Sequence, residues 1–175
     1  MNKINIPGVL IVEGKEDVSY LSSFVNALFF TTNGYDLSKE KIEFLNRATE
    51  VNNLIVFTDS DEAGELIRKR LKEAIPDVKE ARCDLIFRKN AKKRGVAETE
   101  FEAIQKALLP FIGSPLEIYD YNLNSLISLS KNPSESKRIL IEKYRLIGGN
   151  NKSIEHQLNI LRIKHCEIKE LLSGN

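Results

Sequence analysis

Short apolar runs alternate with amphipathic stretches over roughly the first 111 residues. The runs VLIV (9–12), ALFFT (27–31), NLIVFT (53–58) and EARCDLIF (80–87) are short, rich in β-branched or aromatic residues, and typical of buried strands. Strands that alternate with helical patterns indicate an α/β fold. We therefore predict a mostly parallel sheet flanked by helices.

Helical periodicity occupies the intervals between these runs. After Asp59, apolar residues recur on one face of a 3.6-residue period, and Pro76 is expected to end that helix. Ser38 is a candidate N-cap for another helix, and a further helix is predicted over 99–109. The inward-facing residues after Asp59 are Ala63, Leu66, Ile67, Leu71, Ala74 and Ile75.

The chain changes character after Gly113, beyond which no strand is predicted. NPSE (132–135) predicts a helix start, with an asparagine cap, proline in the first helical position and a glutamate for a capping box. Gly148 and Gly149 suggest a helix C-cap, and further helices are predicted over 152–160 and 165–172. We therefore expect two domains, residues 1–112 and a small all-helical C-terminal module over 113–175.

Composition narrows the class of protein without identifying it. The chain has 42% hydrophobic and 29% charged residues and a net charge of +1, which is ordinary for a soluble globular protein. No apolar run approaches the length of a membrane span, and the N-terminus lacks the features of a signal peptide. Cys83 and Cys166 are too few and too far apart for a disulfide framework or a zinc site. A cytoplasmic monomer without a membrane partner is the expectation.

Carboxylates follow two of the predicted strands. Asp59 and Asp61 come directly after the third run, and Glu13 comes directly after the first. Ligands bind at the carboxyl ends of parallel strands, and two close carboxylates need protonation or a cation such as Mg²⁺. If the two strands are neighbours, the three side chains form one metal pocket that can assist phosphoryl transfer. The alternative is that each aspartate only caps a helix.

The order and spacing of these motifs resemble those of a known domain. Strand-Glu-Gly-Lys-x-Asp followed about 45 residues later by strand-Asp-x-Asp-x-x-Gly is similar to the Toprim domain of topoisomerases, bacterial primases and several nucleases. TTNG (31–34), FTDSDEAGELIRK (57–69), the basic loop before GVAE (95–98), and GGNNKSIEHQLNILRI (148–163) resemble the ribonuclease M5 family. The resemblance covers nearly the whole chain, more strongly up to about residue 110.

That resemblance implies a Toprim-type α/β fold and a Mg²⁺-dependent endoribonuclease that cleaves the double-stranded part of precursor 5S rRNA to release mature 5S rRNA. In some bacteria a ribosomal protein prefolds the RNA. Glu13 is the expected acid/base or metal-linked glutamate, with Asp59 and Asp61 as the metal-binding pair. Glu65 and Glu98 match glutamates of the family and are candidates for a second metal site, although exposed helix glutamates are mostly only solvated.

Basic and turn residues are candidates for RNA contact. RKNAKKR (88–94) has five basic residues in seven and is expected beside the site, where it can track phosphates, although such a run is often only a solvated loop. Arg68 belongs to a basic stretch of the preceding helix, and Asn33 with Gly34 can bring backbone amides to a phosphate or merely form a turn. The candidate RNA-binding residues are Lys15, Asn33, Gly34, Arg68, Arg88, Lys89, Lys92, Lys93 and Arg94.

Two other hypotheses stay open at this point. The first is a small Toprim DNA enzyme, such as a nuclease or a primase-like protein, although the chain is short and lacks further polymerase elements. The second is a non-catalytic nucleic-acid-binding Toprim module, which would be expected to carry a cysteine cluster that two distant cysteines cannot supply. Assays on RNA and duplex DNA, with and without Mg²⁺, discriminate among the three.

Overall fold

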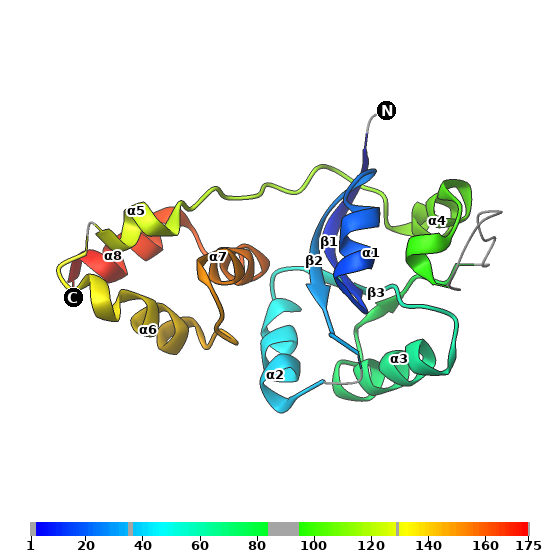
Figure 1. Cartoon of the computed structure of the whole chain (residues 1–175), viewed down its shortest axis with the longest axis horizontal. Coiled ribbons are helices and arrows are strands. Elements are labelled where there is room, and N and C mark those ends of the chain that lie inside the picture. Colours follow the sequence, from blue (N-terminus) through cyan, green and yellow to red (C-terminus); the bar gives the residue numbers. More distant parts are fainter. Residues whose placement is uncertain (1–2, 35–36, 84–94, 129, 175) are drawn as a thin grey trace. The chain divides into compact units, whose positions relative to one another are not determined.

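A computed structural model gives the fold and describes residues 3–34, 37–83, 95–128 and 130–174. The chain forms two compact units, Met1–Leu116 and Glu117–Asn175 (Figure 1). None of the helices in the described part of the chain is long and apolar enough to cross a bilayer.

The first unit is built on a four-stranded sheet in which every neighbouring pair of strands is parallel. Its strands are β1 (Ile4–Val12), β2 (Val25–Thr31), β3 (Asn53–Val56) and β4 (Lys79–Glu80), in the order β2-β1-β3-β4. The predicted α/β class with a parallel sheet is thus confirmed. Glu13 and Asp59 follow strands that are direct neighbours, because β1 pairs with both β2 and β3.

The fourth strand is shorter than predicted. Only Lys79–Glu80 pairs as a strand, and residues 81–83 leave the ladder, while 84–87 lie outside the described residues. The reason is that β3 ends at Val56, so β4 has little partner strand to pair with beyond Glu80. A further backbone hydrogen bond, from the Ala81 amide to the Val56 carbonyl at 3.0 Å, joins the two segments just beyond β4.

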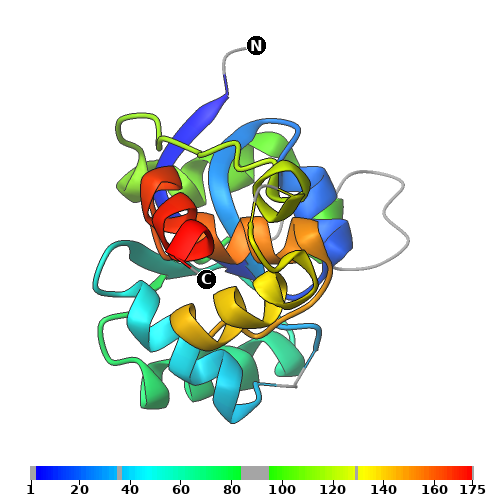
Figure 2. The same cartoon turned by 90° about the vertical axis from the view of Figure 1, so that its left-hand side faces the viewer.

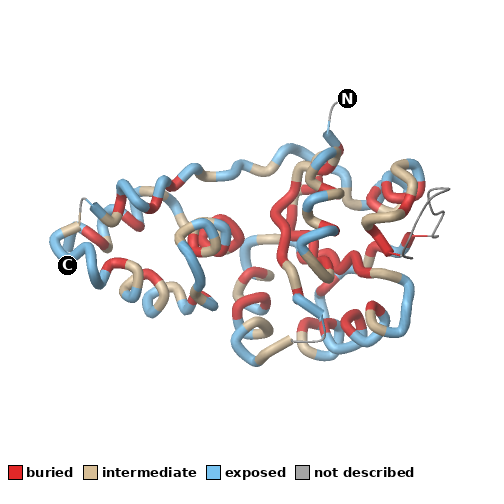
Figure 3. The backbone as a smooth tube through the Cα atoms, in the orientation of Figure 1, coloured by how far each residue is buried: buried red, intermediate tan, exposed pale blue. Residues whose placement is uncertain are grey.

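Helices cover both faces of this sheet. On one face, side chains of alternate strand positions pack with Leu21 of α1 (Lys15–Leu21) and with Ala103 and Ile104 of α4 (Phe101–Leu108). On the other face, Phe30 stacks on Phe44 of α2 (Lys39–Ala48), with ring centroids 5.9 Å apart. Helix α3 (Glu62–Ala74) runs beside α2 in both views (Figures 1 and 2). The strands are therefore buried on two sides (Figure 3).

Local sequence signals set several of the helix ends. Ser38 caps α2 as predicted, accepting a hydrogen bond from the Lys41 amide at 3.5 Å. Helix α3 ends at Ala74, just before Pro76, and α4 lies within the predicted 99–109. Two 3-10 turns, η1 (Val96–Glu98) and η2 (Leu109–Phe111), flank α4. The inward face of α3 differs from the prediction, because Leu66 is 40% exposed and Arg68 takes an inward position instead.

The described part of the second unit, residues 117–128 and 130–174, is all helical as predicted, with α5 (Leu123–Ser128), α6 (Pro133–Tyr144), α7 (Asn151–Ile160) and α8 (His165–Gly174). Helix α6 begins at Pro133 after Asn132, and α7 and α8 begin and end close to the predicted positions. The predicted C-cap at Gly148 and Gly149 is wrong. Arg145 ends α6 in the left-handed region at φ 46°, because the Leu146 amide bonds back to the Ile141 carbonyl at 2.9 Å.

Candidate active site at the carboxyl edge of the sheet

Glu13 and Asp59 meet where β1 and β3 end. The backbone amide of Asp59 donates a hydrogen bond to Oε1 of Glu13 at 2.9 Å, which joins residues 46 positions apart in the chain. Gly64 makes this approach possible, since a Cβ there would lie 2.0 Å from the Asp59 carbonyl oxygen and 3.0 Å from Oε1 of Glu13. Two neighbouring parallel strands thus bring Glu13 and Asp59 together at their carboxyl ends, where ligands bind in such sheets.

Asp61 caps a helix and is also exposed to solvent. It is the N-cap of α3, and its Oδ1 accepts a hydrogen bond from the Gly64 amide at 2.8 Å. The capping alternative considered for the Asp-x-Asp motif therefore describes Asp61 correctly. The cap uses one carboxylate oxygen, and the side chain is exposed at the carboxyl edge of the sheet.

A third segment closes the site from a direction that the sequence does not reveal. The Val96 amide donates to Oδ1 of Asp59 at 2.5 Å, and a Cβ at Gly95 would lie 2.6 Å from Oδ2 of Asp59. GVAE (95–98) is part of the resemblance, but the sequence did not predict these contacts with Asp59. Gly95 was a further signal, because a glycine permits close approach of the backbone to a side chain.

Asp17 is a fourth carboxylate of this edge. It is 9% exposed and accepts a hydrogen bond from the Gly14 amide at 2.9 Å. Burial raises the pKa of this carboxyl overall, although the backbone of Ala97 and of Glu13 lies close enough to lower it. Asp17 therefore ties the β1–α1 turn, which carries Glu13, to η1, whose Val96 holds Asp59.

The clustered carboxylates perturb one another. Burial, together with the nearby charges of Asp59, Asp61 and Asp17, raises the pKa of Glu13 from 4.5 to about 7, against the hydrogen bond from the Asp59 amide, which lowers it. Burial also raises the pKa of Asp59, with Asp17 and Asp61 adding to the effect and Arg68 opposing it. Half-buried carboxylates that repel one another are stabilised by a bound cation.

The donor set fits a hard divalent cation that retains water. Glu13, Asp59 and Asp61 each use one oxygen in a backbone hydrogen bond, and their second oxygens have no hydrogen-bond partner among the described residues. In the same part of the chain, no three His, Cys, Asp or Glu side chains surround one point closely enough to form a metal cage. Mg²⁺ is bound in proteins by few carboxylates together with water and substrate phosphate, which suits this open arrangement.

The two glutamates considered for a second metal lie in different surroundings. The Glu65 carboxylate contacts Arg68 at 2.7 Å and Arg82 at 3.0 Å, so its charge is already compensated by guanidinium groups. Glu98 lies in η1, close in sequence to the residues that contact Asp59. A second metal site at these residues stays a prediction.

The candidate RNA-binding residues separate into three groups. Lys15, Asn33 and Gly34 are exposed, and the Asn33 amide donates to the Glu13 carbonyl at 2.9 Å, which places this turn beside the site. Arg68 is 2% exposed, which contradicts its expected position on an exposed basic face. The basic residues Arg88, Lys89, Lys92, Lys93 and Arg94 lie outside the described residues.

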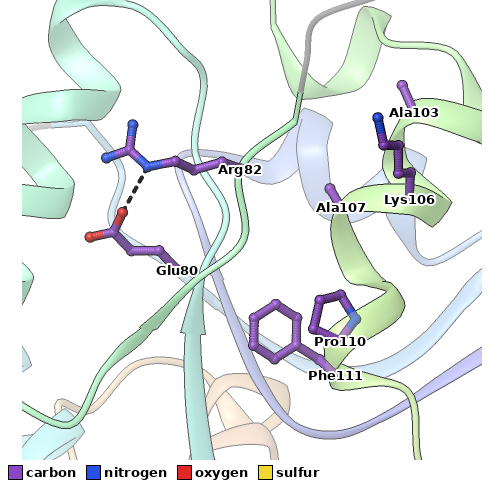
Figure 4. A pocket seen from close by; sticks show the side chains of 7 residues that line it. All are labelled: Glu80, Arg82, Ala103, Lys106, Ala107, Pro110 and Phe111. Atoms are coloured by element: carbon purple, nitrogen blue, oxygen red, sulfur yellow. Dashed lines mark hydrogen bonds and ion pairs between the residues drawn. The ribbon is translucent and has the colours of Figure 1, made fainter.

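A separate cavity of about 300 Å³ lies between residues 80–82 and α4. None of the four site carboxylates lines it, and its wall is mostly apolar, including Ala103, Ala107 and Phe111. The guanidinium of Arg82 points toward Glu80 and away from these residues (Figure 4). The cavity is therefore not part of the carboxylate site.

Comparisons with known proteins agree with this fold. Residues 8–90 match the Toprim domain family. The chain is similar to ribonuclease M5 of Mycoplasma genitalium, with 31% identity over 95% of this chain and 94% of that protein. It is also similar to ribonuclease M5 of Fusobacterium nucleatum, with 34% identity over 96% and 95%. The structure of a small TOPRIM domain protein from Bacillus stearothermophilus matches 63% of this chain and 86% of that one, with 25% identity and a TM-score of 0.50.

Proposed function

The chain belongs to the ribonuclease M5 family, and from this membership we propose that it is an endoribonuclease that matures 5S rRNA. Its substrate is precursor 5S rRNA, which it cleaves in the double-stranded part to release the mature RNA. Toprim domains are metal-dependent nuclease domains, and Mg²⁺ is the metal that we assign to this one.

One observation carries the proposal. Glu13 and Asp59 are joined by a 2.9 Å hydrogen bond at the open carboxyl edge of the sheet, with Asp61 two residues beyond. A pair of half-buried, mutually repelling carboxylates has an electrostatic cost that a structural role alone does not explain. Binding of a divalent cation offsets this cost.

The side chains of the site have different roles in the proposed reaction. When bound, Mg²⁺ supplies activation of water and neutralises charge on the phosphate. Asp59 and Asp61 provide carboxylate ligands, and the amides of Val96 and Gly64 hold these carboxylates in position. Glu13 either joins them as a ligand or accepts a proton from the attacking water. Its pKa of about 7 suits a general base at neutral pH.

RNA binding is assigned to the surface around this edge. Exposed Lys15 and the turn of Asn33 and Gly34 lie close in sequence or by hydrogen bonding to Glu13, so they can contact the phosphates that flank the scissile bond. The basic run Arg88, Lys89 and Lys92–Arg94 supports the same role through its charge. We further assign RNA binding to the helical unit and a role for a 5S-binding ribosomal protein in shaping the substrate.

The test is cleavage of a precursor 5S rRNA transcript with and without Mg²⁺, beside an Asp59→Ala/Asp61→Ala double variant. We expect discrete cuts that flank the mature sequence in the wild type and none in the variant. Duplex DNA of the same helical sequence is the matched substrate control and should stay intact. Intact RNA even with the cognate ribosomal protein, or equal cleavage of DNA, would refute the proposal.

A further inference from the structure

Arg68 lies in α3 with its side chain only 2% exposed, although a guanidinium is costly to bury without partners. Its Nη1 contacts Oε1 of Glu65 at 2.7 Å, and its Nη2 donates to the Thr58 carbonyl at 2.5 Å. Its Nε has no hydrogen-bond partner among the described residues. A charge held inside the fold in this way is not available to RNA on the surface.

The Thr58 carbonyl is the last one before Asp59. Thr58 is itself 2% exposed, and its Oγ1 donates to the Gly64 carbonyl at 3.2 Å. The guanidinium therefore links the body of α3 to the turn that carries both aspartates. Its effect is also electrostatic, because Arg68 lowers the pKa of Asp59 against the other influences on that carboxyl.

The ion pair between Arg68 and Glu65 continues into a chain of further ion pairs. Glu65 contacts Arg82 at 3.0 Å, and Arg82 contacts Glu80 at 2.9 Å (Figure 4). Glu80 in turn contacts Lys72 of α3 at 2.5 Å. Glu80 belongs to β4 and its side chain is 12% exposed, so the chain joins α3 to the edge of the sheet. Such outer partners orient the groups that bind metals.

We infer that Arg68 is a positioning residue for Asp59 and Asp61, and that Glu65 serves it as the orienting partner rather than binding a metal. The inference rests on the proposed function, because it assigns Arg68 to the same carboxylate site. Arg68 acts on the aspartates through the Thr58 carbonyl and has no contact with RNA. A lysine cannot replace it, since only the planar fork of arginine reaches the carbonyl and Glu65 together.

The test compares Arg68→Lys with Lys69→Gln, which changes the exposed neighbour on the same helix. Mg²⁺ binding to the RNA-free protein is measured by calorimetry, and kcat and KM are measured on the precursor transcript. We expect Arg68→Lys to weaken Mg²⁺ binding and lower kcat by roughly 10- to 100-fold, as for other residues behind metal ligands. Its KM for RNA should stay within about twofold, because no RNA contact is lost. Lys69→Gln should leave Mg²⁺ affinity unchanged.

Amide exchange gives a readout that needs neither metal nor substrate. In the wild type the Asp59 amide is bound to Glu13. Its hydrogen exchange, followed by NMR, should be faster in Arg68→Lys and unchanged in Lys69→Gln. If the wild-type protein cleaves no RNA, the proposed function fails, and this measurement still decides whether Arg68 positions the turn.

Glu65→Gln provides a second variant should Arg68→Lys not fold, since Glu65 is 48% exposed. It should weaken Mg²⁺ binding less than Arg68→Lys does. Abolition of metal binding by Glu65→Gln would overturn the inference by making Glu65 a ligand. A raised KM for RNA in Arg68→Lys with unchanged kcat and Mg²⁺ affinity would equally overturn it, in favour of RNA contact. Unchanged exchange at Asp59 would show that Arg68 is only a packing residue.

Discussion

Buried polar side chains serve opposite purposes in the two units of the molecule. In the helical unit, Asn159 is 5% exposed and its amide is fully engaged, accepting from the Tyr119 amide at 2.7 Å and donating to the Tyr119 carbonyl at 2.9 Å. At the sheet edge of the other unit, Glu13 and Asp59 are half-buried and ionisable, and each is bonded through one oxygen. The first arrangement is satisfied within the fold, whereas we propose that a bound cation completes the second.

This difference indicates that the paired amides of the helical unit contribute to stability, and the carboxylates of the sheet edge to function. Neutral amides with paired bonds hold the 117–123 segment against α7 without electrostatic cost. Clustered carboxylates repel one another, and we propose that this cost is tolerated because they bind a cation. Changes in the helical unit should therefore alter stability without altering the metal site, and changes at the sheet edge should do the reverse.

The largest stability effect is expected in the helical core. Leu158 of α7 is fully buried, and Leu158→Ala should lower the free energy of unfolding by about 2–5 kcal/mol through lost transfer energy and a cavity. Urea denaturation followed by far-ultraviolet circular dichroism measures this loss. Mg²⁺ affinity of the folded variant should equal that of the wild type, and a weakened affinity would show that the units are energetically coupled.

The next effect concerns a glycine at the sheet edge. Gly64→Ala would normally favour a helix by about 1 kcal/mol. Here the new Cβ would meet the Asp59 carbonyl at 2.0 Å, so the turn must move and kcat on precursor RNA should fall by roughly 100-fold. Gly174→Ala is the matched control at the end of α8, where no atom lies within 4 Å, and it should be silent. Unchanged kcat in Gly64→Ala would contradict the close packing of the site.

A smaller loss of stability is expected from Asn159→Ala. The change leaves the Tyr119 amide and carbonyl without their side-chain partners, which should cost about 1–3 kcal/mol. Urea denaturation measures the loss, and kcat per folded molecule should not change. A fall in kcat larger than the loss of folded protein would instead make this region part of RNA recognition.

The smallest expected effect is a gain in stability, produced by Glu13→Gln. In metal-free protein Glu13 has a pKa raised from 4.5 to about 7, so the folded state keeps a proton that the unfolded state releases. Stability should fall as the pH rises between these values, and Glu13→Gln should remove this fall. Because Glu13 is half exposed to solvent, screening reduces the gain at pH 8 to about 1 kcal/mol.

Thermal unfolding at pH 8 and pH 4 measures this gain, which should vanish at the lower pH. Mg²⁺ should stabilise the wild type at pH 8 and stabilise Glu13→Gln less. An equal response of both proteins to Mg²⁺ would place the metal away from Glu13.

Several features could be read from residues close in sequence. The Ser38 cap and the end of α3 before Pro76 were predicted correctly, because capping and the restricted backbone of proline act locally. The start of α6 at Pro133 was also predicted correctly, but the side chain of Asn132 makes no capping hydrogen bond there. Gly148 and Gly149 predicted a helix C-cap that does not form, because α6 already ends at Tyr144 with Arg145 as its C-cap. Helix α5 was not predicted, since it is too short to show a clear period.

By itself the sequence determined the parallel α/β class, the helical second unit and the motif that places acidic residues after two strands, because hydrophobic periodicity and strand ends are local properties. Only the tertiary structure decided what those residues touch. It joined Asp59 to Glu13 and Val96, gave Asp61 a capping bond, and turned Arg68 inward to the Thr58 carbonyl. These contacts link segments far apart in the chain, and a buried guanidinium and an exposed one have the same letter in a sequence.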